Sequence, residues 1–214
     1  MPIPPKKLVD HPIALIPQIR EKWGEAALLE FAIYTYIPQQ EGLREIFQIA
    51  AKGVTPEWLA DQLAHLQKGQ EIALQSRINA ENGDEFHIGM IDFALTSMKF
   101  DPRPLMRRHL GQLAEQIQYY RSGKSYHGYL IEQFSNEELV RFWASALLCE
   151  EHKPRAITDT RWVGHRLASG YGALRWSCHT KPYNRLPYKW DFDAIPNPQP
   201  KKHHFAVKDW ANHL

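Results

Sequence analysis

The residues best suited to chemistry in this chain are concentrated between residues 164 and 176, in the stretch GHRLASGYGALRW. Three glycines and three basic side chains occur there: Gly164, Gly170, Gly172, His165, Arg166 and Arg175. Glycines admit backbone conformations closed to other residues and let a phosphate approach bare backbone amides. The pattern predicts a phosphate-contacting loop. It is equally typical of a glycine-rich turn ahead of a strand, and the residues alone favour neither interpretation.

Charge is distributed unevenly along the 214 residues, whose net charge is +2. Residues 1–100 carry 9 Lys and Arg against 13 Asp and Glu, whereas residues 101–214 carry 17 against 11. From His152 onward there are 11 basic and 4 acidic residues, with four of the seven tryptophans. Cations hold phosphates and flat rings stack on bases in single-stranded nucleic-acid sites. The last third of the chain is therefore predicted to bind a polyanion, first of all RNA; a basic surface over core tryptophans is the alternative.

The composition is that of a globular protein, with 43% hydrophobic and 23% charged residues. No apolar stretch approaches the roughly 20 residues that a membrane helix needs, and the first residues lack the pattern of a secretory signal. We therefore expect a cytoplasmic protein with no membrane partner. The two cysteines, Cys149 and Cys178, are too few for a disulfide framework and are predicted to be free thiols.

The elements that must position these residues are predicted from apolar spacing. The first 80 residues are expected to be helical, with helices over 19–36, over 43–51 and after Thr55-Pro56. A strand is expected within 86–98, then a helix from Asp101-Pro102 to Tyr120, and a strand over 125–134. Ser135 and Glu138 form a capping box that opens the next helix. The glycine segment 163–172 then leads into a strand over 173–179, with Trp176 facing the core.

These elements predict an α+β fold of three parts: a helical portion over 1–84, an α+β portion over 85–181 and an extended tail over 182–214. The tail is rich in proline and aromatic residues and is basic, so we expect it to be extended.

Other motifs carry less weight. Gly123-Lys124-Ser125 resembles the end of a phosphate-binding loop, but the required glycine five residues earlier is Gln118. Cys149, His152, Cys178 and His179 match no compact zinc module, so the cysteines are interpreted as core thiols and neither a metal nor another cofactor is expected.

The order of strand, capped helix, glycine loop and basic strand over residues 125–179 resembles the C-terminal half of the RAMP proteins. These are ferredoxin-like RNA binders of CRISPR systems that resemble RNA-recognition motifs, in which a glycine-rich loop of the form GxRxxxGYG touches the guide RNA. The resemblance implies a ferredoxin-like half, packed against the helical N-terminal portion, whose glycine loop faces RNA. It also implies a role in antiviral defence.

The function expected from this resemblance is that of a non-catalytic RNA-binding subunit of a ribonucleoprotein complex, with guide or other single-stranded RNA and further subunits as partners. One alternative is a metal-independent endoribonuclease with His165, His179, Tyr171 or His127 as general base; another is a mainly helical protein-protein interaction protein. The expected RNA-binding residues are Gly164, His165, Arg166, Ser169, Gly170, Tyr171, Gly172, Arg175, Arg161, Lys153 and Arg155, and Trp176 could stack if exposed.

The basic C-terminal third generates a testable expectation. If it contacts the phosphates of a single strand, the logarithm of affinity should fall linearly with the logarithm of salt concentration, at about −0.7 per phosphate contact. Filter binding across a salt series measures this slope. A flat dependence, or no binding at low salt, would remove the electrostatic interpretation.

Overall fold

A computed structural model describes residues 8–35, 37, 43–95, 101–149, 157–180 and 185–192. In chain order its elements are η2 (Pro12–Leu15), α1 (Ile16–Trp23), β1 (Leu28–Thr35), β2 (Arg44–Ala50), η3 (Ala51–Gly53), α2 (Pro56–His65), β3 (Gln70–Asn79), β4 (Glu85–Phe93), α3 (Arg103–Leu110), α4 (Leu113–Gln116), β5 (Gln118–Ser122), β6 (Ser125–Phe134), α5 (Asn136–Leu147), α6 (Thr160–Ser169), β7 (Ala173–Arg175) and β8 (Tyr188–Lys189). The fold is thus α+β, as predicted.

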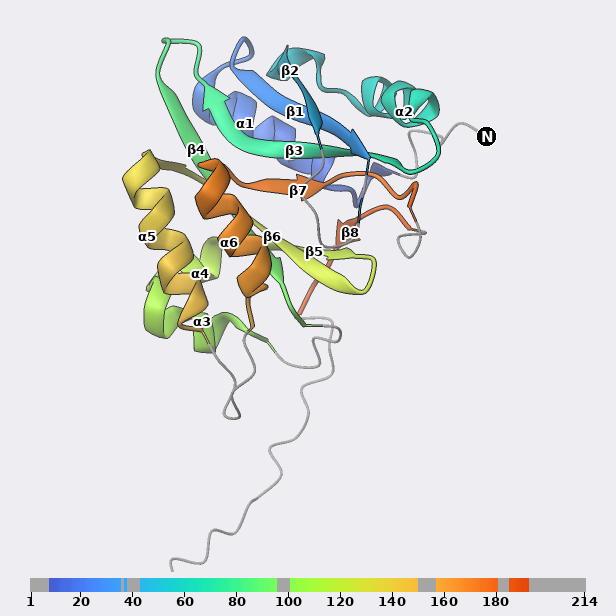
Figure 1. The fold of residues 1–214 in the computed structure, drawn as a ribbon. Helices are drawn as coiled ribbons and strands as arrows, with labels where there is room; N and C mark the ends of the chain where they lie inside the picture. The colour runs from blue at the N-terminus through green and yellow to red at the C-terminus, as the bar shows by residue number, and fades with distance from the viewer. Residues whose placement is uncertain are drawn as a thin grey trace, which may run out of the picture.

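The described strands form one antiparallel sheet of eight strands in the order β2-β1-β3-β4-β6-β5-β8, with β7 paired to β3 outside this path. Strands β3 and β4 pair only at one end, where Arg77 to Asn79 lie opposite His87 to Glu85. Nearer its start, β3 pairs instead with β7, over Ala73 to Gln75. The sheet therefore forks between β3 and β4, and β7 enters the fork (Figure 1).

Two hydrophobic clusters support the two arms of this fork. The first lies between α1, α2 and the strands β1 and β3, and it surrounds the fully buried Trp176. The second lies between β4, β6 and the helices α3, α5 and α6, with Phe93 and Trp143 at its centre. Figure 1 shows α3 to α6 gathered beside β4 and β6, whereas α1 lies behind β1 and β3. Each arm is thus anchored by its own helices.

The predicted helical character of the first 80 residues is wrong. Residues 28–35 and 44–50 form β1 and β2, and β3 begins at Gln70. Four consecutive residues of β1 are buried, so the apolar run LLEFAI lacks the alternation of a half-exposed strand. A short continuous apolar run is common to buried helices and buried strands. The helix predicted after Thr55-Pro56 is confirmed as α2, and Thr55 caps it by accepting from Trp58 N.

The long helix predicted from Asp101 to Tyr120 is divided in the structure. Helix α3 ends at Leu110, because Gly111 has a φ of 58° that ends the helical hydrogen bonding, and α4 is a single turn. Strand β5 then begins at Gln118. Strand β6 has the predicted bounds, and the predicted capping box is present, because Ser135 Oγ accepts from Glu138 N and Glu138 accepts from Ser135 N.

The predicted glycine loop over 163–172 is a helix for most of its length. Asp159 caps α6 by accepting from the backbone N–H groups of Arg161 and Trp162, and Gly170 ends it with a φ of 77°. An aspartate and a glycine at these positions are ordinary signals for the two ends of a helix. The following strand stops at Arg175 rather than residue 179. The described residues therefore show neither the expected ferredoxin-like half nor the glycine loop.

The remaining expectations concern the cysteines, the tail and membranes. Cys149 is buried in the second cluster as predicted, whereas Cys178 is half-buried. In the predicted tail, β8 and its neighbours at 185–192 are described, and residues 193–214 lie outside the described part of the chain. None of the helices in the described ranges has the length and apolar character needed to cross a membrane.

Trp176 faces the core as predicted. Its exposed fraction is 0%, and its indole Nε1 donates to the Tyr129 hydroxyl at 3.1 Å. Replacing Trp176 by Ala should lower the free energy of unfolding by about 3 to 5 kcal/mol, because it leaves a large cavity and an unsatisfied hydroxyl. Urea melts measure this. Leu167→Ala on the exposed side of α6 is the control, expected within about 0.5 kcal/mol of wild type. Equal stability of the two variants would contradict the assignment.

Candidate active site

The fork in the sheet brings together a carboxylate, an imidazole and a guanidinium. Asp92 on β4 and His127 on β6 are directly opposite each other in the antiparallel ladder, so their side chains lie on the same face. The distance from His127 Nε2 to Asp92 Oδ1 is 4.0 Å. Arg175, the last residue of β7, lies close enough for its charge to shift the pKa of both. Three strands distant in sequence thus build one polar cluster.

Asp92 is the carboxylic acid of this cluster, and its pKa is strongly raised. Its pKa is raised to about 8, first by burial and then by the nearby negative charge of Asp159, against the opposing effects of Arg175 and a backbone hydrogen bond from Phe93. The side chain is nevertheless 26% exposed, so it is accessible from one side. A strongly perturbed, accessible carboxyl is a common feature of functional sites. Below about pH 8 Asp92 is mainly protonated, and a bound cation would favour its ionised form.

His127 is kept neutral by its surroundings. Only 6% of it is exposed, and burial, followed by the charges of Arg175 and His11, lowers its pKa well below the usual value. Its Nδ1 atom is buried and has no hydrogen-bond partner among the residues that the structure describes. A buried polar atom without a partner costs about 1 to 3 kcal/mol, so such atoms in a native fold call for an explanation such as a ligand or an ordered water. His127 therefore has capacity for one further hydrogen bond inside the cluster.

Both terminal nitrogens of the Arg175 guanidinium donate hydrogen bonds. Nη2 donates to Ser122 Oγ on β5 at 2.7 Å, and Nη1 donates to the carbonyl oxygen of Ser177. These contacts place a positive charge that is only 7% exposed beside Asp92 and His127. A fixed cation in a desolvated site attracts phosphate more strongly than one in water.

His11 supports the cluster from the N-terminal segment. Its Nδ1 accepts from Ile13 N at 3.1 Å, so its Nε2 carries the proton and donates to the Trp176 carbonyl oxygen at 2.8 Å. Its pKa is lowered to about 4, first by burial and also by the charge of Arg175, against the raising effect of the hydrogen bond to Trp176. His11 is therefore neutral and fixes the backbone next to Arg175.

Helix α6 begins beside Asp92. The backbone N–H of Asp159 donates to the carbonyl oxygen of Asp92 at 2.8 Å, while the Asp159 carboxylate caps the helix. At the other end of α6, the chain passes through Gly172, whose N–H donates to Ser76 Oγ at 2.8 Å. A Cβ at Gly172 would lie 3.2 Å from Met90 Cβ, so the close approach of the chain to β4 accounts for a glycine at this position.

Among the described residues that were predicted to bind RNA, Arg175 is the one that belongs to this cluster. Arg175 and Arg166 are buried, with exposed fractions of 7% and 3%. Arg166 lies over the ring of Tyr171 at 5.4 Å, and Arg77 lies over the same ring at 4.7 Å. The other described members lie on α6 or at its C-terminal end: Arg161, Gly164, His165, Ser169 and Gly170. Lys153 and Arg155 lie outside the described residues.

Sequence reasoning named His127 only as one of four alternative bases and missed Asp92. One signal could have found Asp92: it is a carboxylate between Ile91 and Phe93, at the end of the apolar run that follows His87 in β4. A charge there is costly to bury unless it has a function or a partner.

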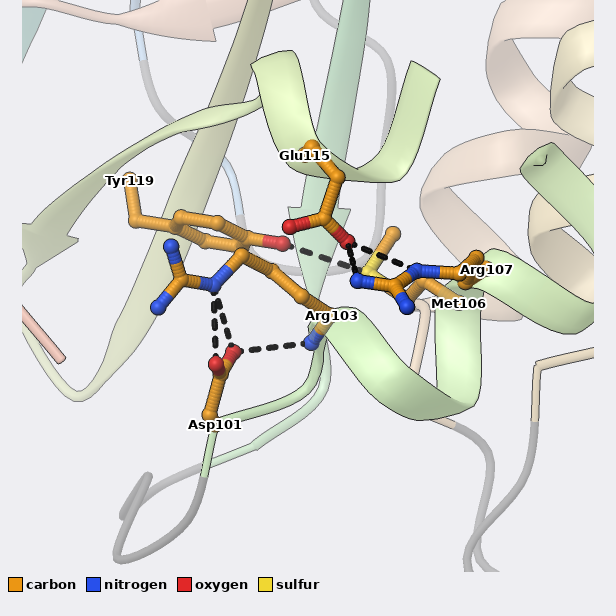
Figure 2. A network of polar contacts seen from close by, with 6 residues as sticks. All are labelled: Asp101, Arg103, Met106, Arg107, Glu115 and Tyr119. Carbon is orange, nitrogen blue, oxygen red and sulfur yellow. Dashed lines mark hydrogen bonds and ion pairs between the residues drawn. The ribbon is translucent and has the colours of Figure 1, made fainter. Parts of the chain in front are cut away.

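A second polar network surrounds α3, and its charges pair with one another (Figure 2). Arg103 binds Asp101 at 2.8 Å, and Arg107 binds Glu115 at 2.6 Å. The hydroxyl of Tyr119 donates to Met106 Sδ at 3.4 Å. This network joins α3, α4 and β5, and its carboxylates pair with arginines at partly exposed positions, so we assign it a structural role.

The α+β fold and the cluster at its fork define a protein with a site suited to phosphate-containing ligands. The chain belongs to the AEP-like family, described as archaeo-eukaryotic primase 1D-like, which matches residues 50–188. This range contains Asp92, His127 and Arg175. No curated protein and no solved structure matches the chain.

This membership corrects the functional interpretation of the sequence. Residues 125–179, which suggested a RAMP protein, lie inside the primase-like range. The assignments to CRISPR guide-RNA binding, antiviral defence and a ribonucleoprotein subunit are therefore wrong, and so are the ribonuclease and helical-interaction alternatives. The resemblance failed because its central motif, the glycine loop, is mostly helix α6. Primases act on nucleic acid, so the family still implies a nucleic-acid partner.

The raised pKa of Asp92 predicts a pH dependence of stability. A carboxyl that binds its proton more tightly in the folded state, with a pKa of about 8 against an ordinary 3.8, favours folding at low pH and loses this advantage as pH rises. Between these values the wild type should lose up to about 1.4 kcal/mol of unfolding free energy per pH unit relative to Asp92→Asn. Urea melts at about pH 5 and about pH 9 test this. Parallel curves for the two proteins would show that Asp92 titrates normally.

Proposed function

We propose that this protein is a primase-related nucleotidyltransferase, with its site at Asp92, His127 and Arg175. One observation supports this above the others: within the primase-like range, an accessible carboxyl of raised pKa lies beside a histidine with an unsatisfied Nδ1 and a fixed guanidinium. Family membership alone would indicate a class of activity. The cluster supplies the residues at which nucleotidyl transfer would take place.

In nucleotidyl transfer, the 3′-hydroxyl of a growing strand attacks the α-phosphorus of a nucleoside triphosphate and pyrophosphate leaves. Negative charge accumulates on the phosphate oxygens, so the protein contributes mainly positioning and positive charge. Arg175 is suited to binding these oxygens, because Ser122 and Ser177 fix its guanidinium. His127, neutral and buried, is suited to a hydrogen bond with a substrate hydroxyl or phosphate.

The site could hold a divalent cation, but it offers few protein ligands for one. The charges of Asp92 and Asp159 repel each other, which a cation would relieve. Among the residues that the structure describes, however, no group of three or more His, Cys, Asp or Glu side chains could hold a metal ion. Asp92 would therefore be the principal protein ligand, with phosphates and water completing the shell, as is usual for Mg²⁺ in nucleotide sites. When bound, such an ion would supply charge neutralisation to the phosphates.

The nucleic-acid partner is proposed to be single-stranded. The excess of 11 basic over 4 acidic residues after His152 and the aromatic side chains among them support this proposal. RNA as the preferred strand is the finer proposal, and DNA of the same sequence is its direct comparison.

Replacement of Asp92 by Asn tests the proposed activity. Incorporation of labelled nucleotides on a single-stranded template, with Mg²⁺ or Mn²⁺, should fall by about 10²-fold or more, because the amide cannot carry the negative charge. Asp84→Asn in the exposed β3–β4 turn is the matched control and should retain wild-type incorporation. Full activity of Asp92→Asn would place the chemistry elsewhere.

A second candidate is a primase-like domain that binds nucleic acid without polymerising nucleotides. It is favoured by one observation, the lack of a three-ligand metal group among the described residues. Template binding with no incorporation by the wild-type protein would support this candidate over the first.

A further inference from the structure

Glu71, near the start of β3, is a buried carboxylate that the proposed chemistry does not use. Its exposed fraction is 0%, and no basic side chain in the described part of the chain pairs with it. Oε1 accepts from Thr180 N at 2.7 Å and from Thr180 Oγ1, and Oε2 accepts from Ser177 Oγ. These side-chain bonds therefore go to the segment 176–180, which follows β7.

This segment leaves the regular ladder where β7 ends. The Trp176 N–H still donates to the Ile72 carbonyl oxygen at 2.8 Å, but the Ile72 N–H donates to the side chain of Ser177, also at 2.8 Å. Ser177 Oγ thus accepts from Ile72 N and donates to Glu71, which fixes the orientation of the residue. The main-chain carbonyl of the same serine accepts from Arg175 Nη1. Glu71 is therefore connected to the guanidinium of Arg175 through one residue.

We infer that Glu71 is a positioning residue, which holds the segment 176–180 against β3 and thereby fixes the guanidinium of Arg175 in the site. The inference rests on the proposed function for the use of Arg175, but the contact it describes can be tested without substrate. Removing the acceptor at Glu71 breaks one of the bonds that orient the Ser177 hydroxyl and leaves it only its contacts with the Ile72 backbone, so the Ser177 carbonyl is held less firmly toward Arg175. The guanidinium then loses the hold of the Ser177 carbonyl and keeps its bond to Ser122.

Cys178 provides a reporter inside this segment. It is half-buried between Ser177 and His179, whereas Cys149 is buried in the second cluster. Its pKa is raised by burial first and by the charge of Glu71 next, so neutralising Glu71 would also make the thiol more reactive without any movement. Two variants separate these effects: Glu71→Gln removes the charge and replaces one of the two acceptor oxygens by an NH2 donor, so it cannot accept from both Ser177 and Thr180, and Ser177→Ala breaks the connection while leaving the charge in place.

The experiment uses the full chain and two readouts that require no nucleotide. In both variants, labelling of Cys178 by a thiol reagent should be about tenfold faster than in wild type, with Cys149 as the internal reference. In nuclear magnetic resonance spectra of ¹⁵N-labelled protein, the guanidinium signals of Arg175, assigned with Arg175→Lys, should show slow rotation in wild type and merge in both variants. Glu30→Gln is the matched control, because Glu30 is also buried, at 7%, but contacts Arg77 and not this segment.

Unchanged Arg175 signals in Ser177→Ala would overturn the inference, and faster labelling in Glu71→Gln alone would assign the effect to charge. If the wild-type protein incorporates nucleotides, both variants should raise the KM for nucleotide about tenfold while changing kcat less, because ground-state phosphate binding is what they weaken. If it incorporates none, the proposed activity fails, whereas the labelling and resonance results still decide the role of Glu71.

Discussion

The fork between β3 and β4 is the feature on which the site depends. Two strands that diverge leave backbone N–H and C=O groups without partners, and such groups cannot be buried unsatisfied. The three residues of β7 pair with β3 at this position, and side chains take over where β7 ends. Because β7 ends at Arg175, the same pairing that completes the sheet carries a cation to the strands that bear Asp92 and His127.

The charges around the fork reinforce one another. Arg175 favours the ionised form of Asp92 and the neutral forms of His127 and His11, because each is close and partly or wholly removed from water. The result is one fixed positive charge, two neutral imidazoles and one carboxyl that changes its charge near neutral pH. This combination is suited to a phosphate ligand with an associated cation. In the network of Figure 2, by contrast, every carboxylate is matched by an arginine, and a structural role accounts for it.

The glycines of residues 163–172 are compatible with a phosphate-binding loop in the sequence, but most of this segment is helix α6 in the structure. Between residues 160 and 169 the glycine and the basic residues lie on a helix capped by Asp159 and Gly170, so they form no continuous cradle for phosphate. The helix instead packs against β4 and α5 and brings the Asp159 carboxylate next to Asp92. The positive charge of this segment that enters the site is that of Arg175, which lies beyond the helix.

The sequence by itself determined the features that depend on neighbouring residues. The capping box at Ser135, the N-cap at Thr55, the bounds of β6 and the core position of Trp176 follow from local hydrogen bonding and apolar periodicity. Tertiary structure decided that the apolar runs at 28–35 and 44–50 are strands, because buried strands and buried helices share the same composition. It also decided the site. Asp92, His127 and Arg175 are far apart in the chain, and only the pairing of β4 with β6 and of β7 with β3 brings them together, since no local pattern specifies which strands become neighbours.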